Sequence, residues 1–95
     1  MAKAQVKKSS KLRPRSAIKQ ILQDALRRRF PRDTVDISDG YQEHIHVVVV
    51  SRDFDEMTEE EKQQLLWKII DKTDLTAAEK YLISLIYPVS PAEIK

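Results

Sequence analysis

Residues 44–54 read HIHVVVVSRDF, and this stretch decides the fold. Four consecutive valines, Val47–Val50, are typical of a β-strand buried on at least one face, because β-branched side chains suit a pleated surface. We predict the strand from about Glu43 to Ser51. His44 and His46, at its head, are the only histidines of the chain, so any imidazole chemistry has to start here.

The segment before this strand predicts its partner. In Thr34–Ser38, Val35 and Ile37 alternate with polar residues, as in a half-buried strand. Asp39 and Gly40 then form a turn signal. The two strands are therefore predicted to form an antiparallel β-hairpin with a loop of about five residues.

Helical patterns flank the hairpin. Pro14 and Ser16 predict the start of a first helix, and Pro31 ends it by disfavouring the α conformation at Phe30. Its apolar stripe is Ile18, Ile21, Leu22, Ala25 and Leu26. Beyond Phe54, a buried-looking anchor, Thr58 with Glu61 forms a capping box, and the helix it opens ends near residues 72–73.

A second capping box and a last strand complete the pattern. Thr76 with Glu79 predicts one or two further helical turns. Residues 82–88 have strand composition, and Pro88 marks its end or a sheet edge. The fold class is α+β: an α-β-β-α-(α)-β order with a three-stranded mixed sheet and helices packed on one face, in two layers.

Length and composition exclude several classes. Ninety-five residues make one domain at most. The absence of cysteine excludes disulfides, thiol nucleophiles and thiolate metal sites, and no apolar run approaches the roughly 18 residues of a membrane span. One glycine argues against a phosphate-cradling loop. We expect a monomeric cytoplasmic protein that does not contact membranes.

Charge divides the chain into a basic and an acidic part. Residues 1–32 hold eleven Lys or Arg and one acid, whereas residues 33–95 hold six Lys or Arg and fourteen acids. Residues 1–13 are predicted to be a disordered basic arm, and residues 14–95 the folded domain. The basic part either binds nucleic acid or is a solvated tail and helix face. The candidate nucleic-acid contacts are Lys7, Lys8, Lys11, Arg13, Arg15, Arg27, Arg28 and Arg29.

Several short motifs, in order, resemble the BolA family, whose fold is similar to a class II K-homology domain. Val47–Ser51 followed by Phe54 resembles the family's V-V-x-V-S-x-x-F signature, and residues 43–45 its Ser-His-Phe. The other matching segments are residues 36–38, 65–67 and 91–93, and the resemblance spans roughly residues 14–94.

The resemblance implies a partner of monothiol glutaredoxins in iron–sulfur or iron regulation, with a shared [2Fe–2S] cluster. Tyr41 at the hairpin tip, His44, and Lys62 in the main helix are the candidate partner contacts. The family's histidine near the last strand is missing, because residues 80–84 read KYLIS. The ligands are therefore altered, and no intrinsic cofactor is expected.

The histidines allow two interpretations. His44 and His46, two apart, would share one face of a strand and are weak candidate metal ligands. The alternative is a solvent-facing pair opposite the valine core. No nucleophile–base pair is visible, so we expect no enzyme. The predicted function is a BolA-like interaction module; the alternative is a K-homology-like nucleic-acid module using the basic arm and first helix.

Overall fold

The sheet has three strands, and the valine strand is its centre. The computed structural model describes residues 12–93, with β1 (Thr34–Asp39), β2 (Ile45–Val50) and β3 (Ile83–Val89). The strand order is β1-β2-β3; β1 and β2 pair antiparallel, and β2 and β3 pair parallel. The predicted mixed sheet is confirmed.

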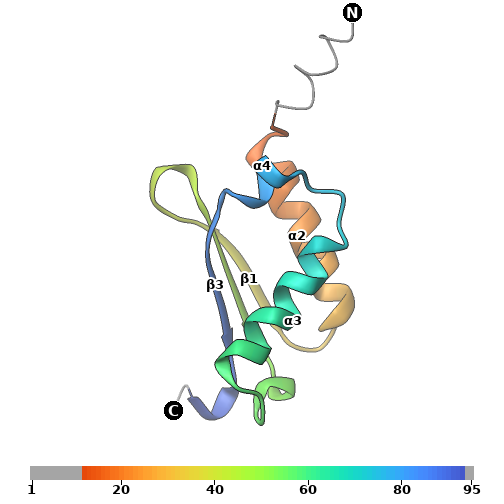
Figure 1. Cartoon of the computed structure of the whole chain (residues 1–95), viewed down its shortest axis with the longest axis vertical. Coiled ribbons are helices and arrows are strands. Elements are labelled where there is room, and N and C mark those ends of the chain that lie inside the picture. Colours follow the sequence, from red (N-terminus) through yellow and green to blue (C-terminus); the bar gives the residue numbers. More distant parts are fainter. Residues whose placement is uncertain (1–11, 94–95) are drawn as a thin grey trace, which may run out of the picture.

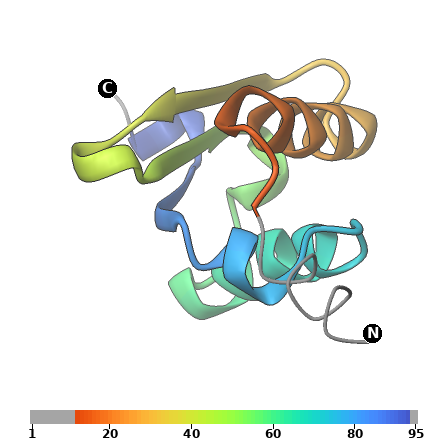
Figure 2. The same ribbon diagram turned by 90° about the horizontal axis from the view of Figure 1, so that it is seen from above.

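The helices form the second layer. The long helices are α2 (Arg15–Arg29) and α3 (Glu59–Asp71), and α4 (Ala77–Lys80) is a single turn before β3. Both long helices lie on the same side of the sheet (Figures 1 and 2). The predicted two-layer α+β architecture is therefore confirmed. No helix within residues 12–93 has the length and apolarity needed to cross a membrane.

Strand alternation places the core between the layers. Ile45, Val47 and Val49 of β2 are completely buried, whereas the residues between them are only half-buried. The core side chains that the long helices bury are Ile18, Leu22, Leu26, Leu66 and Ile70. Burying each such side chain contributes about 1.5–3 kcal/mol, so the interface between the two layers stabilises the fold strongly.

Local signals fix the helix ends as predicted. The Thr58 hydroxyl accepts from the Glu61 amide while Glu61 accepts from the Thr58 amide, which completes the capping box of α3. Thr76 and Glu79 do the same for α4. Helix α2 begins directly after Pro14 without a side-chain cap, and it ends at Arg29, before Pro31.

The exit from β2 explains why serine and phenylalanine stand three residues apart. The buried Ser51 hydroxyl accepts from the Asp53 amide, and the Phe54 amide donates to the Ser51 carbonyl. This single turn, η2 (Arg52–Phe54), aims the Phe54 ring into the core. There it meets Phe30 at a centroid distance of 5.6 Å, so the turn joins the end of β2 to the end of α2.

The hairpin loop has the predicted five residues, 40–44, and contains the turn η1 (Tyr41–Glu43). Gln42 and Glu43 have φ values of 53° and 66°, in the left-handed region that a continuing strand cannot use. The prediction that β2 begins at Glu43 was therefore two residues too early.

The outer edge of β3 is protected against further strand pairing. Pro88 has no amide to offer at this edge. The side-chain amide of Gln63 on α3 donates to the Ile86 carbonyl at 2.8 Å. Pro88 and Gln63 belong to β3 and α3 themselves, so this edge is protected against strand pairing without an additional strand or helix.

Candidate functional site

The face of the sheet opposite the helices carries exposed apolar side chains. Tyr87 of β3 is 57% exposed and pairs with half-buried Val48 on β2. Exposed Leu85 is likewise paired with His46. The paired side chains form a small, largely apolar cluster bordered by Asp36 and Ser38 of β1, and exposed apolar clusters are typical of interaction surfaces. We call Tyr87, Val48, Leu85 and His46 the sheet-face patch.

Two more exposed tyrosines lie beyond the patch. Tyr41 in the hairpin loop is 81% exposed, as its predicted place at the tip suggested. Tyr81, just before β3, is 83% exposed and borders a depression of about 410 Å³ that Trp67 also lines. All three tyrosines of the chain thus face solvent. Tyrosine supplies large contact area at small entropic cost, so it is common in binding surfaces.

Sequence reasoning missed Tyr81, Leu85 and Tyr87. The predicted strand was correct, but its faces could not be assigned, because Ser84 and Leu85 are both exposed and break the alternation. The cause is a register irregularity where Ile45 pairs with Ile83 and His46 with Leu85. Trp67 is half-buried against the core.

His44 organises the hairpin loop. Its Nδ1 lies 3.0 Å from the Tyr41 carbonyl oxygen, and the His44 amide donates to the same carbonyl at 3.2 Å. The imidazole therefore holds the loop that presents Tyr41, with Nε2 as its remaining ring nitrogen.

His46 has different surroundings. It belongs to β2, whereas His44 precedes the strand, so the strand alternation expected to align the two begins only at Ile45. The His46 ring lies against Gly40. Within residues 12–93, no three His, Cys, Asp or Glu side chains are grouped closely enough to hold a metal ion.

The prediction that Lys62 contacts a partner was wrong. Its side chain is 2% exposed, and its ammonium donates to Glu59 at 3.0 Å and to both oxygens of Glu93 at 3.0 and 3.1 Å. The hydrogen bond to Glu59 and the one to Glu93 raise the pKa of Lys62 against the opposing effect of burial. Lys62 instead ties the C-terminal turn η3 (Pro91–Glu93) to α3.

Arg13 is a second cation with an internal role. Its guanidinium donates to Asp74 and to Glu79, whose side chain is 1% exposed, and its backbone amide also donates to Glu79 at 2.9 Å. The side-chain hydrogen bond to Asp74, which has the larger effect, and the one to Glu79 raise the pKa of Arg13. Arg13 was assigned to the arm and to nucleic-acid binding, but it belongs to the folded domain.

The remaining predicted cations do not form one surface. Arg15 and Lys19 pair with Asp39, and the Lys19 hydrogen bond lowers the pKa of that carboxyl. Arg29 pairs with Asp53 and lies over the Phe30 ring. Arg27 and Arg28 are exposed. Lys7, Lys8 and Lys11 lie outside the described residues.

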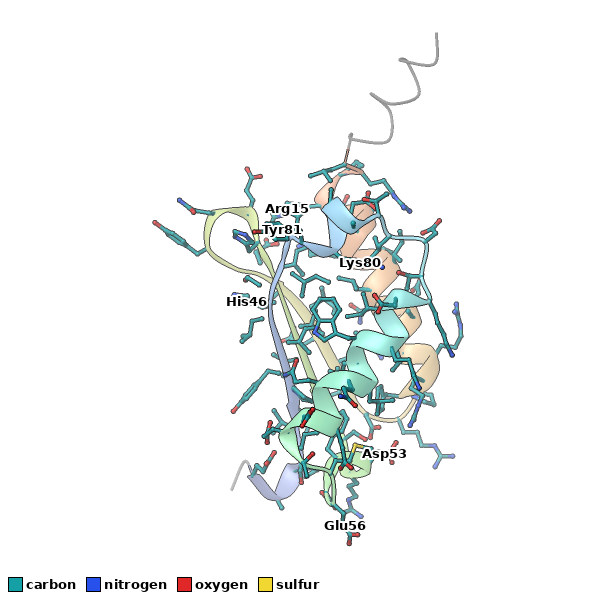
Figure 3. All side chains as sticks on the ribbon, in the orientation of Figure 1. Arg15, His46, Asp53, Glu56, Lys80 and Tyr81 are labelled. Atoms are coloured by element: carbon teal, nitrogen blue, oxygen red, sulfur yellow. The ribbon has the colours of Figure 1, made fainter. Side chains whose placement is uncertain are left out.

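The acidic connector between β2 and α3, residues 53–56 with the sequence DFDE, is remote from Tyr81 at the end of α4. Figure 3 shows Lys80 and Tyr81 in the upper half of the coloured ribbon, and Asp53 and Glu56 at its lower end. A ligand bound near Tyr81 therefore lies away from the acidic connector.

Comparisons of the chain with models of known protein families, with curated proteins and with solved structures gave no match.

Proposed function

We propose that this chain is a non-enzymatic protein-interaction module of BolA-like architecture, and that its partner binds the sheet-face patch. One observation carries the proposal: Tyr87 and Leu85 are exposed beside Val48 and His46 on the face that the helices leave open. An aromatic side chain flanked by aliphatic ones on a rigid sheet suits the anchor of a protein interface.

The partner we propose is a monothiol glutaredoxin in the cytoplasm, as the family resemblance implies. A shared [2Fe–2S] cluster does not fit the donors present. His44 can offer one imidazole nitrogen at the hairpin, but the segment before β3 presents Lys80, Tyr81 and Leu82, which supply neither imidazole nor thiolate. The proposed role is therefore regulation by binding, without ligation of the cluster by this chain.

The test is a binding titration of the isotope-labelled chain with a monothiol glutaredoxin, in apo and cluster-loaded forms, followed by NMR. We expect shifts at the sheet-face patch and at Tyr41. Tyr87→Ser should weaken binding about tenfold or more, because a buried aromatic anchor contributes about 2 kcal/mol or more and 1.4 kcal/mol corresponds to a factor of ten. Arg32→Ala, at an exposed site away from the patch, is the control.

Two results would contradict this proposal. If neither form of the glutaredoxin associates, that partner is excluded. If the glutaredoxin binds but Tyr87→Ser has no effect, the sheet-face patch is not the site.

Nucleic-acid binding is the second candidate function, and the basic excess of residues 1–32 supports it. Its test is the salt dependence of oligonucleotide binding before and after deletion of residues 1–11. This deletion leaves Arg13 in place to hold Glu79. Loss of a steeply salt-dependent affinity upon deletion would support the nucleic-acid function. Unchanged binding would exclude the arm as the segment that binds nucleic acid.

A further inference from the structure

A second surface lies on the opposite side of the molecule, between the two long helices. Three depressions of about 440, 200 and 240 Å³ follow one another along α2 and α3. We call this surface the interhelical groove. It is lined chiefly by Ile21, Ala25, Arg28, Leu65, Ile69 and Lys72.

The groove follows two helices that run in opposite directions. Ile21 near the start of α2 shares a depression with Thr73, beyond the end of α3, whereas Arg29 at the end of α2 shares one with Glu61 in the first turn of α3. At a rise of about 1.5 Å per residue, residues 21–29 span roughly 12 Å, which matches two to three turns of a third helix.

The groove is lined by apolar side chains that the core buries only in part. Seven partly buried hydrophobic residues pack against the core, and Ile21, Met57, Leu65 and Ile69 among them line these depressions. Each has one side on the core and another toward solvent. A third apolar helix face could cover them by ordinary ridge-into-groove packing.

Cations without an acidic partner border this apolar floor. Within residues 12–93, Arg28, Lys68 and Lys72 make no ion pair, although six other Lys or Arg side chains do. The middle depression has Arg28 and Lys72 as its only charged residues. Three acids also line the groove: Asp74 is paired with Arg13, whereas Glu61 caps α3 and Asp24 accepts from the neutral Gln20 amide, so these two keep their charge at the ends of the groove.

We propose that the interhelical groove binds a short amphipathic helix of another protein, with apolar residues on one face and Asp or Glu on its flanks. The apolar floor takes the hydrophobic face, and Arg28, Lys68 and Lys72 take the carboxylates. The N-terminal segment of this chain has the wrong charge for the groove, because its charged residues, Lys3, Lys7, Lys8 and Lys11, are all cations. Nucleic acid fits less well, because no aromatic side chain lines the three depressions for base stacking.

The test uses a synthetic 15-residue helical peptide as the probe, with Leu at helical spacing and Glu on its flanks. We expect saturable NMR shifts at Ala25, Ile69 and Thr73. The double variant R28E/K72E should weaken binding about tenfold or more, because like charges then face each other. The matched control is R32E/R52E, which changes net charge equally at exposed cations that lie outside the groove and make no ion pair among the described residues.

The controls separate this inference from the alternatives. Equal weakening by both double variants, or equal binding of a peptide with Lys in place of Glu, would overturn it. So would tighter competition by a single-stranded oligonucleotide, or self-association of the chain that R28E/K72E abolishes. The variant Y87S should bind the acidic peptide normally, so failure of the groove and failure of the sheet-face patch are distinguishable.

Discussion

The imidazole of His46 occupies the space that a side chain on Gly40 would need. A Cβ atom at Gly40 would lie 2.6 Å from Cδ2 and 3.0 Å from Cε1 of the ring. Gly40 has φ −106° and ψ −161°, a backbone conformation open to any residue. The close approach of His46 therefore favours glycine at this position, which holds the only glycine of the chain, and this preference depends on His46.

We therefore expect the effect of Gly40→Ala on the free energy of unfolding to depend on whether His46 is present, which a double-mutant cycle measures. Gly40→Ala should lower the free energy of unfolding by about 1 kcal/mol, at the lower end of overpacking costs, because the half-exposed ring can turn away. In a His46→Ala background the same substitution should be neutral or stabilising by up to about 1 kcal/mol, because it only restricts the unfolded chain. Chemical denaturation of the four proteins measures this, and an equal cost in both backgrounds would contradict the steric account.

Glu79 predicts a loss of stability in acid. Burial raises the pKa of Glu79, but hydrogen bonds from the Thr76 and Arg13 amides and the Arg13 guanidinium outweigh it and lower the pKa overall. A group with a lowered folded-state pKa stabilises the fold above its unfolded-state pKa of about 4.5, and this contribution is lost as pH falls through the folded-state value.

Replacing Glu79 tests this linkage. Glu79→Gln should lower the free energy of unfolding at pH 7 by about 2 kcal/mol, because charged hydrogen bonds are lost at a buried site. It should also flatten the decline of stability below about pH 4.5. Exposed Glu60→Gln is the control, and urea denaturation at several pH values is the measurement. A parallel pH profile in both variants would exclude Glu79 as a source of the acid sensitivity.

The contact between Lys62 and Glu93 holds the C-terminal turn η3, so we expect its loss to open this turn locally. The Ser90 amide and Lys62 lower the pKa of Glu93, so its stabilising contacts are present at neutral pH and lost as pH falls through this lowered value. Lys62→Met keeps the buried stem and removes the ammonium. We expect the Glu93 amide, which bonds to the Ser90 carbonyl, to exchange about tenfold faster, with little change in core amides. Uniform acceleration throughout the chain would indicate a global role for Lys62 instead.

Phe54 predicts a large cost at the exit from β2. Phe54→Ala should lower the free energy of unfolding by about 3–5 kcal/mol, because the completely buried ring leaves a cavity beside Phe30. Phe54→Leu should cost only about 1 kcal/mol, because it keeps most of the volume. Thermal or chemical denaturation measures both, and similar costs for the two substitutions would mean that ring shape, and not volume, matters at this position.

Local chemistry made most of the fold predictable. The capping boxes of Thr58 and Thr76 each lie within four residues, and the five-residue hairpin loop follows from Asp39 and Gly40 between alternating strands. Such features need no knowledge of tertiary contacts. The same is true of Pro31, which ends α2 through its own covalent geometry.

The contacts that determine whether a candidate site residue is buried or exposed join residues that are far apart in the sequence. Lys62 lies 31 residues from Glu93, and Arg13 lies 66 residues from Glu79. Both cations therefore resemble exposed charges in the sequence although each completes an internal ion pair. The exposure of Tyr87 could not be predicted either, because the side of the sheet on which it lies depends on the irregular pairing of β3 with β2.

The closed edge of β3 has a consequence for self-assembly. Pro88 and Gln63 leave that side of the sheet unable to accept a strand, so the described part of the sheet can be extended only at β1. Two copies joined antiparallel along β1 would use up the free edge of both. Assembly by strand pairing would therefore stop at a two-fold symmetric dimer and could not propagate into a fibre.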